Sequence, residues 1–307
     1  MARSTSGKSG TSGPDGKPGG RTGSRAQQRP TLFVIGGAED RVGKAVVLRR
    51  FVRLAGGRRA RIVIIPTASS VQDEVVDAYT EVFTRLGAPH LSVVNPADRT
   101  ESSDPGLVAL VDQATGVFMS GGSQLKLSQR LNGTPLGEAI HRAHGRGAVI
   151  GGTSAGASIM SEFMISMGDE GITPRQRTSQ LSAGLGLIDG VIIDQHFGQR
   201  ARYGRLMSMV AGSPNLVGVG IDEDTAIEVV DRRLFTVHGR GAVYVLDCRA
   251  ALSDAPEARR GAPLMVSGAV VHSLPAGATF DLRDVRLIEF VEKHPDAAVT
   301  SLATAKA

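Results

Sequence analysis

Cysteine and long apolar runs are scarce in this sequence of 307 residues. Its single cysteine, Cys248, cannot form an internal disulfide, which fits a reducing compartment. No run of eighteen apolar residues is present, so a transmembrane helix is not expected. The N-terminal stretch MARSTSGKSGTSG has no apolar segment behind its charges, which argues against a secretory signal peptide. We therefore expect a cytoplasmic protein. No cluster of Cys and His has the spacing of zinc ligands, so we expect neither a metal nor a cofactor.

The basic charge is concentrated in one segment. Residues 1–29 contain six Lys or Arg and one acid, Asp15, a net of +5 that equals the whole-chain excess of 35 basic over 30 acidic residues. The rest of the chain is formally neutral, so we expect no nucleic-acid partner. Because residues 1–29 are rich in Gly and Ser and almost free of large aliphatic residues, they predict a disordered tail. The predicted organisation is this tail, one α/β domain over residues 30–299, and a frayed C-terminus at 300–307.

Short apolar runs alternate with amphipathic stretches from Thr31 onward. The predicted strands are Thr31–Ile35, Arg61–Ile65, Leu91–Val94, Gly116–Met119 and Ala148–Ile150. The predicted helices between them are Lys44–Leu54, Ser70–Leu86, Gly106–Gln113, Gln124–Leu131 and Leu136–His144. This alternation predicts a three-layer α/β sandwich with a mostly parallel central sheet. In such sheets the functional crevice lies at the carboxyl ends of the strands.

The pattern changes after about Ser208, where short strands follow one another without helices between them. The predicted strands are Val217–Ile221, Ala226–Val230, Leu234–Val237, Ala242–Leu246, Val270–Leu274 and Thr279–Leu282. Turns such as Asp231-Arg232-Arg233 join them. We interpret this region as an antiparallel C-terminal extension of the same domain.

The strongest local motif is Gly152-Thr153-Ser154-Ala155-Gly156, which follows an apolar strand and precedes a helix. This is G-x-S-x-G in a strand–turn–helix context, which predicts Ser154 as a nucleophile. The Ala155 N–H would then point toward a developing oxyanion. On its own, such a turn could instead serve only packing or bind phosphate.

A nucleophilic serine needs a base and an acid that orients the base. His196 follows the apolar run Val191–Ile193 and is soon followed by three arginines, so it is the preferred base. The segment from Asp222 to Asp224 ends another apolar run, and Glu223 is the preferred acid with its two neighbours as rivals. Weaker candidates for the acid, nearer the nucleophile, are Glu162, Asp169 and Glu170. A second strand-to-helix turn at Gly121–Gly122 could supply the other oxyanion donor, for which we take Gly122, and Gln124 beyond it could reach the substrate.

Five motifs in this order resemble the cyanophycinase family of serine peptidases, which is related to the aspartyl dipeptidases. They are IGGAED at Ile35–Asp40, FMSGGSQL at Phe118–Leu125, GGTSAGASIM at Gly151–Met160, DQHFGQRARYGRL at Asp194–Leu206 and GIDEDTA at Gly220–Ala226. The resemblance covers roughly Leu32 to Leu246, and the stretch after DQHF separates this family from the shorter dipeptidases. One departure is Ser123, where the family commonly has Asp.

The resemblance implies a catalytic triad of Ser154, His196 and Glu223, and a homodimer. It also implies substrate-binding positions at Gln124, Asp194, Gln195, Arg200, Arg202 and Arg205. The implied substrate is cyanophycin, a polyaspartate chain with arginine on its side-chain carboxyls, and the implied product is the dipeptide β-Asp-Arg. Arginine side chains can bind the carboxylates of such a polymer, and Asp194 is a natural partner for its guanidinium groups.

Three other functions remain open from the residues. A peptidase for aspartyl or isoaspartyl peptides would not degrade the polymer. An α/β-hydrolase esterase orders its triad Ser, acid, His, and would need a base such as His238 or His272. A catalytically inactive binding protein would not need Ser154, His196 and Glu223 together.

Overall fold

The computed structural model describes residues 29–290. The tail predicted for residues 1–29, apart from Arg29, and the frayed end predicted for 300–307 lie outside the described residues, as do residues 291–299 of the predicted domain. None of the helices in the described part of the chain has both the length and the apolar character to cross a membrane.

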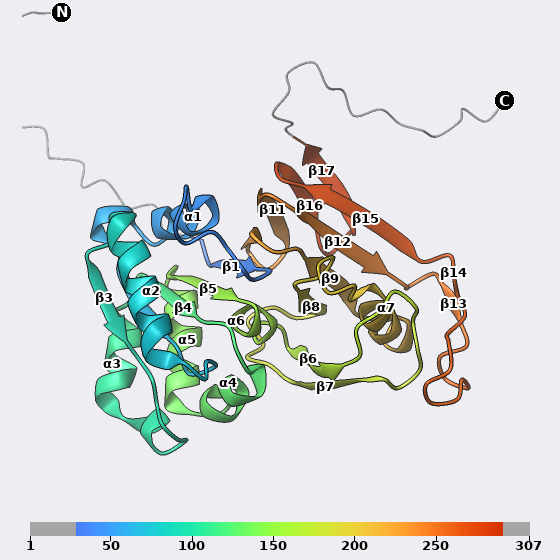
Figure 1. Cartoon of the computed structure of the whole chain (residues 1–307), viewed down its shortest axis with the longest axis horizontal. Helices are drawn as coiled ribbons and strands as arrows, with labels where there is room; N and C mark the ends of the chain where they lie inside the picture. Colours follow the sequence, from blue (N-terminus) through green and yellow to red (C-terminus); the bar gives the residue numbers. More distant parts are fainter. Residues whose placement is uncertain (1–28, 291–307) are drawn as a thin grey trace, which may run out of the picture.

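A nine-stranded sheet forms the centre of the molecule, with the strand order β17-β16-β11-β10-β1-β5-β4-β2-β3. One half is parallel and contains β1 (Thr31–Ile35), β5 (Val149–Thr153), β4 (Gly116–Met119), β2 (Arg61–Ile65) and β3 (His90–Val93). The other half is antiparallel and contains β10 (Thr225–Val230), β11 (Leu234–Gly239), β16 (Ala278–Asp281) and β17 (Arg286–Phe290). The parallel half with its helices and the antiparallel strands occupy opposite sides of Figure 1.

Helices cover both faces of the parallel half, because its strands are apolar on both faces. Phe33 of β1 packs in the same core as α1 (Val46–Leu54) and α2 (Gln72–Arg85). Its neighbour Leu32 points to the other core, which also contains residues of α3 (Pro105–Gln113), α4 (Gln124–Leu131) and α5 (Pro135–Gly145). Because successive side chains of β1 point to opposite faces of the sheet, each face packs against its own layer of helices, which gives three layers. The predicted α/β class, with a parallel sheet and an antiparallel extension, is confirmed.

A second, four-stranded sheet has the order β15-β12-β9-β8. It contains β8 (Val191–Gln195), β9 (Val217–Ile221), β12 (Ala242–Asp247) and β15 (Val270–Pro275), and only the pair β8–β9 is parallel. The helix α7 (Tyr203–Gly212) packs on this sheet through a separate core that includes Leu206 and Leu246. The sequence predicted most of these strands as part of an antiparallel extension but did not predict that they form a separate sheet, because strand pairing is a long-range property that local patterning does not specify.

The remaining elements are short. They are the 3₁₀ helices η1 (Gly57–Arg59) and η2 (Glu101–Ser103), the four-residue helix α6 (Ala155–Ser158), the hairpin β6 (Phe163–Gly168) with β7 (Ser179–Ala183), and the pair β13 (Leu252–Ser253) with β14 (Val266–Ser267). The β6–β7 hairpin was not predicted, since β7 (SQLSA) is mostly polar or small. It borders the cavity described next.

Candidate active site

Ser154 lies on a sharp turn between β5 and α6. Its backbone has φ 54° and ψ −110°, a conformation that L-residues rarely adopt and that is typical of a nucleophile elbow. The glycines on either side have no room for a side chain. A Cβ on Gly152 would lie 2.3 Å from the carbonyl oxygen of Gly156, and a Cβ on Gly156 would lie 2.2 Å from that of Met119. The predicted elbow is therefore the geometry that these residues adopt.

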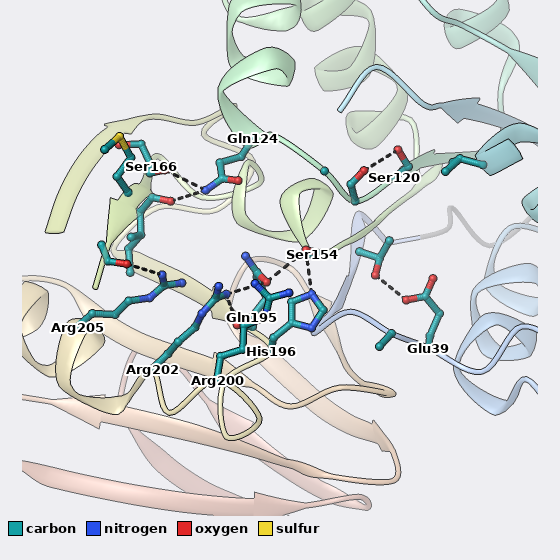
Figure 2. Close-up of a pocket in the computed structure, with 18 of the residues that line it drawn as sticks. Glu39, Ser120, Gln124, Ser154, Ser166, Gln195, His196, Arg200, Arg202 and Arg205 are labelled. Atoms are coloured by element: carbon teal, nitrogen blue, oxygen red, sulfur yellow. Dashed lines mark hydrogen bonds between the residues drawn. The ribbon is translucent and has the colours of Figure 1, made fainter. Parts of the chain in front are cut away.

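His196 and Glu223 lie next to this serine. The Nε2 atom of His196 is 3.1 Å from Ser154 Oγ, and its Nδ1 atom is 2.6 Å from Glu223 Oε1. His196 follows β8 and Glu223 follows β9, and these neighbouring parallel strands bring the two residues to the same edge of the second sheet. Figure 2 shows the imidazole of His196 directed at Ser154. The three residues thus form a continuous Ser–His–Glu hydrogen-bond chain.

The rival acids have other partners. Asp222 accepts hydrogen bonds from the N–H groups of Gly198 and Ala242, and Asp224 accepts one from Asp40. Both acids hold loops together and neither contacts the imidazole within hydrogen-bond range. Among the rival bases, His238 contacts Glu228 at 3.0 Å and His272 packs edge-on against Phe280. Of the weaker acids, Glu170 contacts Arg202.

The environment of His196 keeps its imidazole neutral. Burial lowers the pKa of His196 below its ordinary value by disfavouring the imidazolium; the hydrogen bond to Glu223 opposes this effect, and the nearby Arg200 charge adds to it. The ring also packs closely on Gly37, where a Cβ would lie 2.4 Å from the imidazole and the backbone φ is 104°. A neutral imidazole held in this position can accept a proton from Ser154.

Removing the charge of Arg200 should therefore change the pH dependence of Ser154 reactivity. In Arg200→Ala the pKa of His196 rises, so the acid limb of the rate of inactivation by a small fluorophosphonate should move to higher pH. Arg200→Lys keeps the positive charge and is the matched control, with a limb close to wild type. Coincident acid limbs for Arg200→Ala and wild type would show that the Arg200 charge does not reach His196.

Ser154 opens into a cavity of about 600 Å³. Gly121 and Gly122 line it, and a Cβ on Gly121 would lie 3.3 Å from the Cβ of Ser154. The N–H of Gly122 belongs to the peptide bond that follows Gly121, so this donor group lies near the serine. Ala155 is the first residue of α6, and its N–H has no acceptor within the helix. Both predicted oxyanion donors thus belong to segments that adjoin Ser154.

Five of the six predicted substrate-binding residues line the cavity. They are Gln124, Gln195, Arg200, Arg202 and Arg205. In Figure 2 the three arginines lie on the same side of Ser154 as Gln195. They differ in exposure, since the side chain of Arg200 is 49% exposed and those of Arg202 and Arg205 are 7% and 8% exposed.

Asp194 does not line this cavity. Its side chain is 1% exposed, and both of its carboxylate oxygens accept hydrogen bonds from the guanidinium of Arg205. The sequence suggested that Asp194 would contact a substrate guanidinium. The structure does not bring its carboxylate to the cavity. Its partner is an arginine of the same chain, and the pair fixes the end of β8 beneath the cavity.

Gln195 and Gln124 are also held by the protein. Arg202 Nη1 donates to Gln195 Oε1 at 3.0 Å, which fixes the amide so that its oxygen also faces Ser154 Oγ at 3.3 Å. Gln124 Nε2 donates to the carbonyl of Ile165 at 2.9 Å, which ties α4 to β6. The hydroxyl of Ser154 thus has two possible acceptors, Gln195 Oε1 and His196 Nε2.

Several cavity residues were not selected from the sequence. Glu39 and Tyr79 line the cavity, and so do Ile165 to Gly168 of β6. Glu39 could have been selected as a site residue, because it lies within the IGGAED motif. Tyr79 lies in α2 and Ser166 in the hairpin that was not predicted, and neither position carries a local sequence signal for a site.

The site combines a serine on a strained strand-to-helix turn with a neighbouring histidine whose other ring nitrogen contacts a carboxylate. In an α/β fold, this arrangement is typical of serine hydrolases. Comparison with known proteins agrees with this class. The profile of "Peptidase family S51" matches residues 32–237, and the chain belongs to this family. It is a peptidase.

Curated relatives of this chain include proteins named cyanophycinase. The protein from Geminocystis herdmanii (strain PCC 6308) is 41% identical over 223 residues, which cover 72% of this chain and 82% of the relative. The protein from Nostoc sp. (strain PCC 7120 / SAG 25.82 / UTEX 2576) is 37% identical over 256 residues, 83% of this chain and 86% of the relative. The fold is shared with a solved peptidase from an acI-B1 Actinobacterium, with a TM-score of 0.60, 22% identity, and coverage of 83% of this chain and 98% of that one. The predicted resemblance to cyanophycinases is confirmed.

Proposed function

We propose that this protein hydrolyses cyanophycin to β-Asp-Arg dipeptides through a triad of Ser154, His196 and Glu223. The observation that carries the proposal is the Ser–His–Glu contact chain, which opens into a cavity lined by arginines. The names of the relatives support the choice of substrate. Cyanophycin presents free carboxylates along its length, and arginine is the side chain best suited to bind them.

The proposed reaction begins with attack of Ser154 Oγ on a backbone carbonyl carbon of the polymer. His196 Nε2 takes the serine proton while Glu223 stabilises the imidazolium through Nδ1–H. The N–H groups of Ala155 and Gly122 stabilise the oxyanion. Collapse of the tetrahedral intermediate breaks the C–N bond, and His196 returns the proton to the leaving amine. Water then attacks the acyl-enzyme by the same route and releases the acid, which regenerates Ser154.

The hydroxyl of Ser154 must donate to His196 for this reaction, not to Gln195. In the structure the His196 contact is the shorter of the two, 3.1 Å against 3.3 Å. Because Arg202 already donates to Gln195 Oε1, that oxygen is a weaker acceptor for the serine. The neutral state of His196 makes Nε2 a good acceptor at neutral pH.

A rate comparison tests the choice of substrate. Purified protein should release soluble product from insoluble cyanophycin faster than it cleaves short α-aspartyl or isoaspartyl dipeptides. A protein that cleaves only the short peptides would be a dipeptidase, and the proposed substrate would be wrong. The cytoplasmic location, the homodimer and the lack of a nucleic-acid partner stay predictions.

Of the three cavity arginines, Arg200 offers the cleanest test of carboxylate binding. Its side chain is half exposed, and the one ion pair that it forms within residues 29–290 is a long contact of 3.9 Å with Glu170. Arg200→Ala should lose a charge-assisted hydrogen bond to a substrate carboxylate, which lowers kcat/KM for cyanophycin about ten- to hundred-fold. Labelling of Ser154 by a small uncharged phosphonate, at a pH above the acid limb, should persist. Wild-type kcat/KM in this variant would remove Arg200 from the substrate site.

The same substitution at Arg202 or Arg205 would be harder to interpret. These side chains are buried, and Arg205 pairs with the buried carboxylate of Asp194. Removing Arg205 takes away both guanidinium hydrogen bonds to Asp194 and leaves the carboxylate only the longer 3.7 Å contact with Arg202. The variant should therefore lose folding stability as well as any substrate contact.

A further inference from the structure

The cavity next to Ser154 has two chemically different walls. Arg200, Arg202 and Arg205 lie on one side, and Figure 2 shows Glu39 on the other side of Ser154 and His196. Within residues 29–290, Glu39 is the one Asp or Glu that lines the cavity. A zwitterionic substrate needs both kinds of wall, and Asp194 is already paired behind the first one.

Glu39 is a buried acid whose partners are neutral. It is 6% exposed, and its carboxyl oxygens accept hydrogen bonds from the hydroxyls of Tyr79 and Thr153, the latter at 2.6 Å. Burial, with the neighbouring Glu39, raises the pKa of Tyr79 well above its ordinary value, so its hydroxyl stays protonated and donates. Neither donor carries a positive charge. Buried carboxylates are ordinarily paired with a cation, as Asp194 is here.

No arginine or lysine among residues 29–290 forms an ion pair with Glu39 within 4.0 Å. The candidate nearest in sequence, Arg41, also lines the cavity, but its guanidinium lies 5.7 Å from the ring centroid of Tyr79. A carboxylate has about four acceptor positions, and the two hydroxyl donors leave others free. The cavity thus has a buried acceptor for a cation that the described chain does not supply.

We propose that Glu39 binds the guanidinium of a substrate arginine beside the scissile bond. This inference rests on the proposed function and names the group that recognises the positive end of the substrate. Thr153 links the two sites, because its hydroxyl contacts Glu39 and the next residue is Ser154. An arginine on Glu39 and a carboxylate on the opposite wall would hold the polymer across the nucleophile.

The test compares arginine with citrulline, which has nearly the same shape and no charge. Synthetic β-Asp-Arg and β-Asp-citrulline oligomers are hydrolysed by wild type and by Glu39→Gln, and active sites are counted by fluorophosphonate titration. We expect wild type to prefer the arginine oligomer, and Glu39→Gln to lose at least about tenfold of that preference in kcat/KM. Glu39→Asp keeps the charge and should retain more of the preference than Glu39→Gln. The exposed Glu81→Gln, on the same helix as Tyr79, is the control and should behave as wild type.

A second measurement does not depend on the folding of Glu39 variants. In a crystal structure of Ser154→Ala with the arginine oligomer bound, a guanidinium nitrogen should lie within hydrogen-bond distance of the Glu39 carboxylate. A guanidinium bound elsewhere, or an unchanged arginine preference in titrated Glu39→Gln, overturns the inference while leaving the proposed function intact. If wild type hydrolyses neither oligomer nor cyanophycin, the proposed function itself fails.

Discussion

Ser154→Ala should lower peptidase turnover on the order of a million-fold, because it removes the attacking oxygen and leaves only binding and the oxyanion donors. The fold should be preserved. The residue already adopts φ 54° with a Cβ in place, so alanine adds no backbone strain. The measurement is kcat on cyanophycin together with a thermal unfolding curve.

Ser158→Ala is the matched control, since Ser158 is a buried serine at the end of α6, the short helix that follows Ser154. It should retain turnover close to wild type. A folded Ser154→Ala protein with more than about a tenth of wild-type turnover would show that Ser154 is not the nucleophile.

His196→Ala should be nearly as damaging as Ser154→Ala. The double variant should be little worse than either single variant, because triad residues act as a unit and their effects do not add. Glu223→Gln should be milder than both. The amide keeps the shape of the side chain but loses the charge that stabilises the imidazolium. Single-turnover rates for the three single variants and the double variant measure this pattern.

The two acidic neighbours of Glu223 serve as controls for its assignment as the triad acid. Asp222 and Asp224 bond to backbone N–H groups, so their Asn variants should mainly affect stability. If Glu223→Gln is fully active while an Asp222 or Asp224 variant is folded and inactive, the acid assignment moves to that residue.

Local patterning predicted most elements of the parallel half. The strands Thr31–Ile35, Arg61–Ile65 and Gly116–Met119 have the predicted bounds, and the helices differ by at most two residues at an end. These segments are apolar on both faces or strongly amphipathic, and glycines mark their ends. The candidate triad could be selected because each of its residues follows an apolar strand, which is a local signal.

The second sheet and the role of Asp194 could not be predicted for the same physical reason. Pairing of β12 with β9 and β15, and of Asp194 with Arg205, joins positions that are distant or on different elements. The sequence places an acid and three arginines close together but does not say which of them face the cavity. Side-chain burial decides this. Asp194 is buried against an arginine, and Glu39, near the start of the domain, is the acid that lines the cavity.

The central claim is most directly tested by incubating insoluble cyanophycin with the purified wild-type protein and determining the mass of the soluble product. The proposed triad and cavity predict the dipeptide of one aspartate and one arginine as the main product, and its absence when Ser154→Ala is used. Free arginine with an intact polyaspartate chain, or no soluble product at all, would contradict the proposed function.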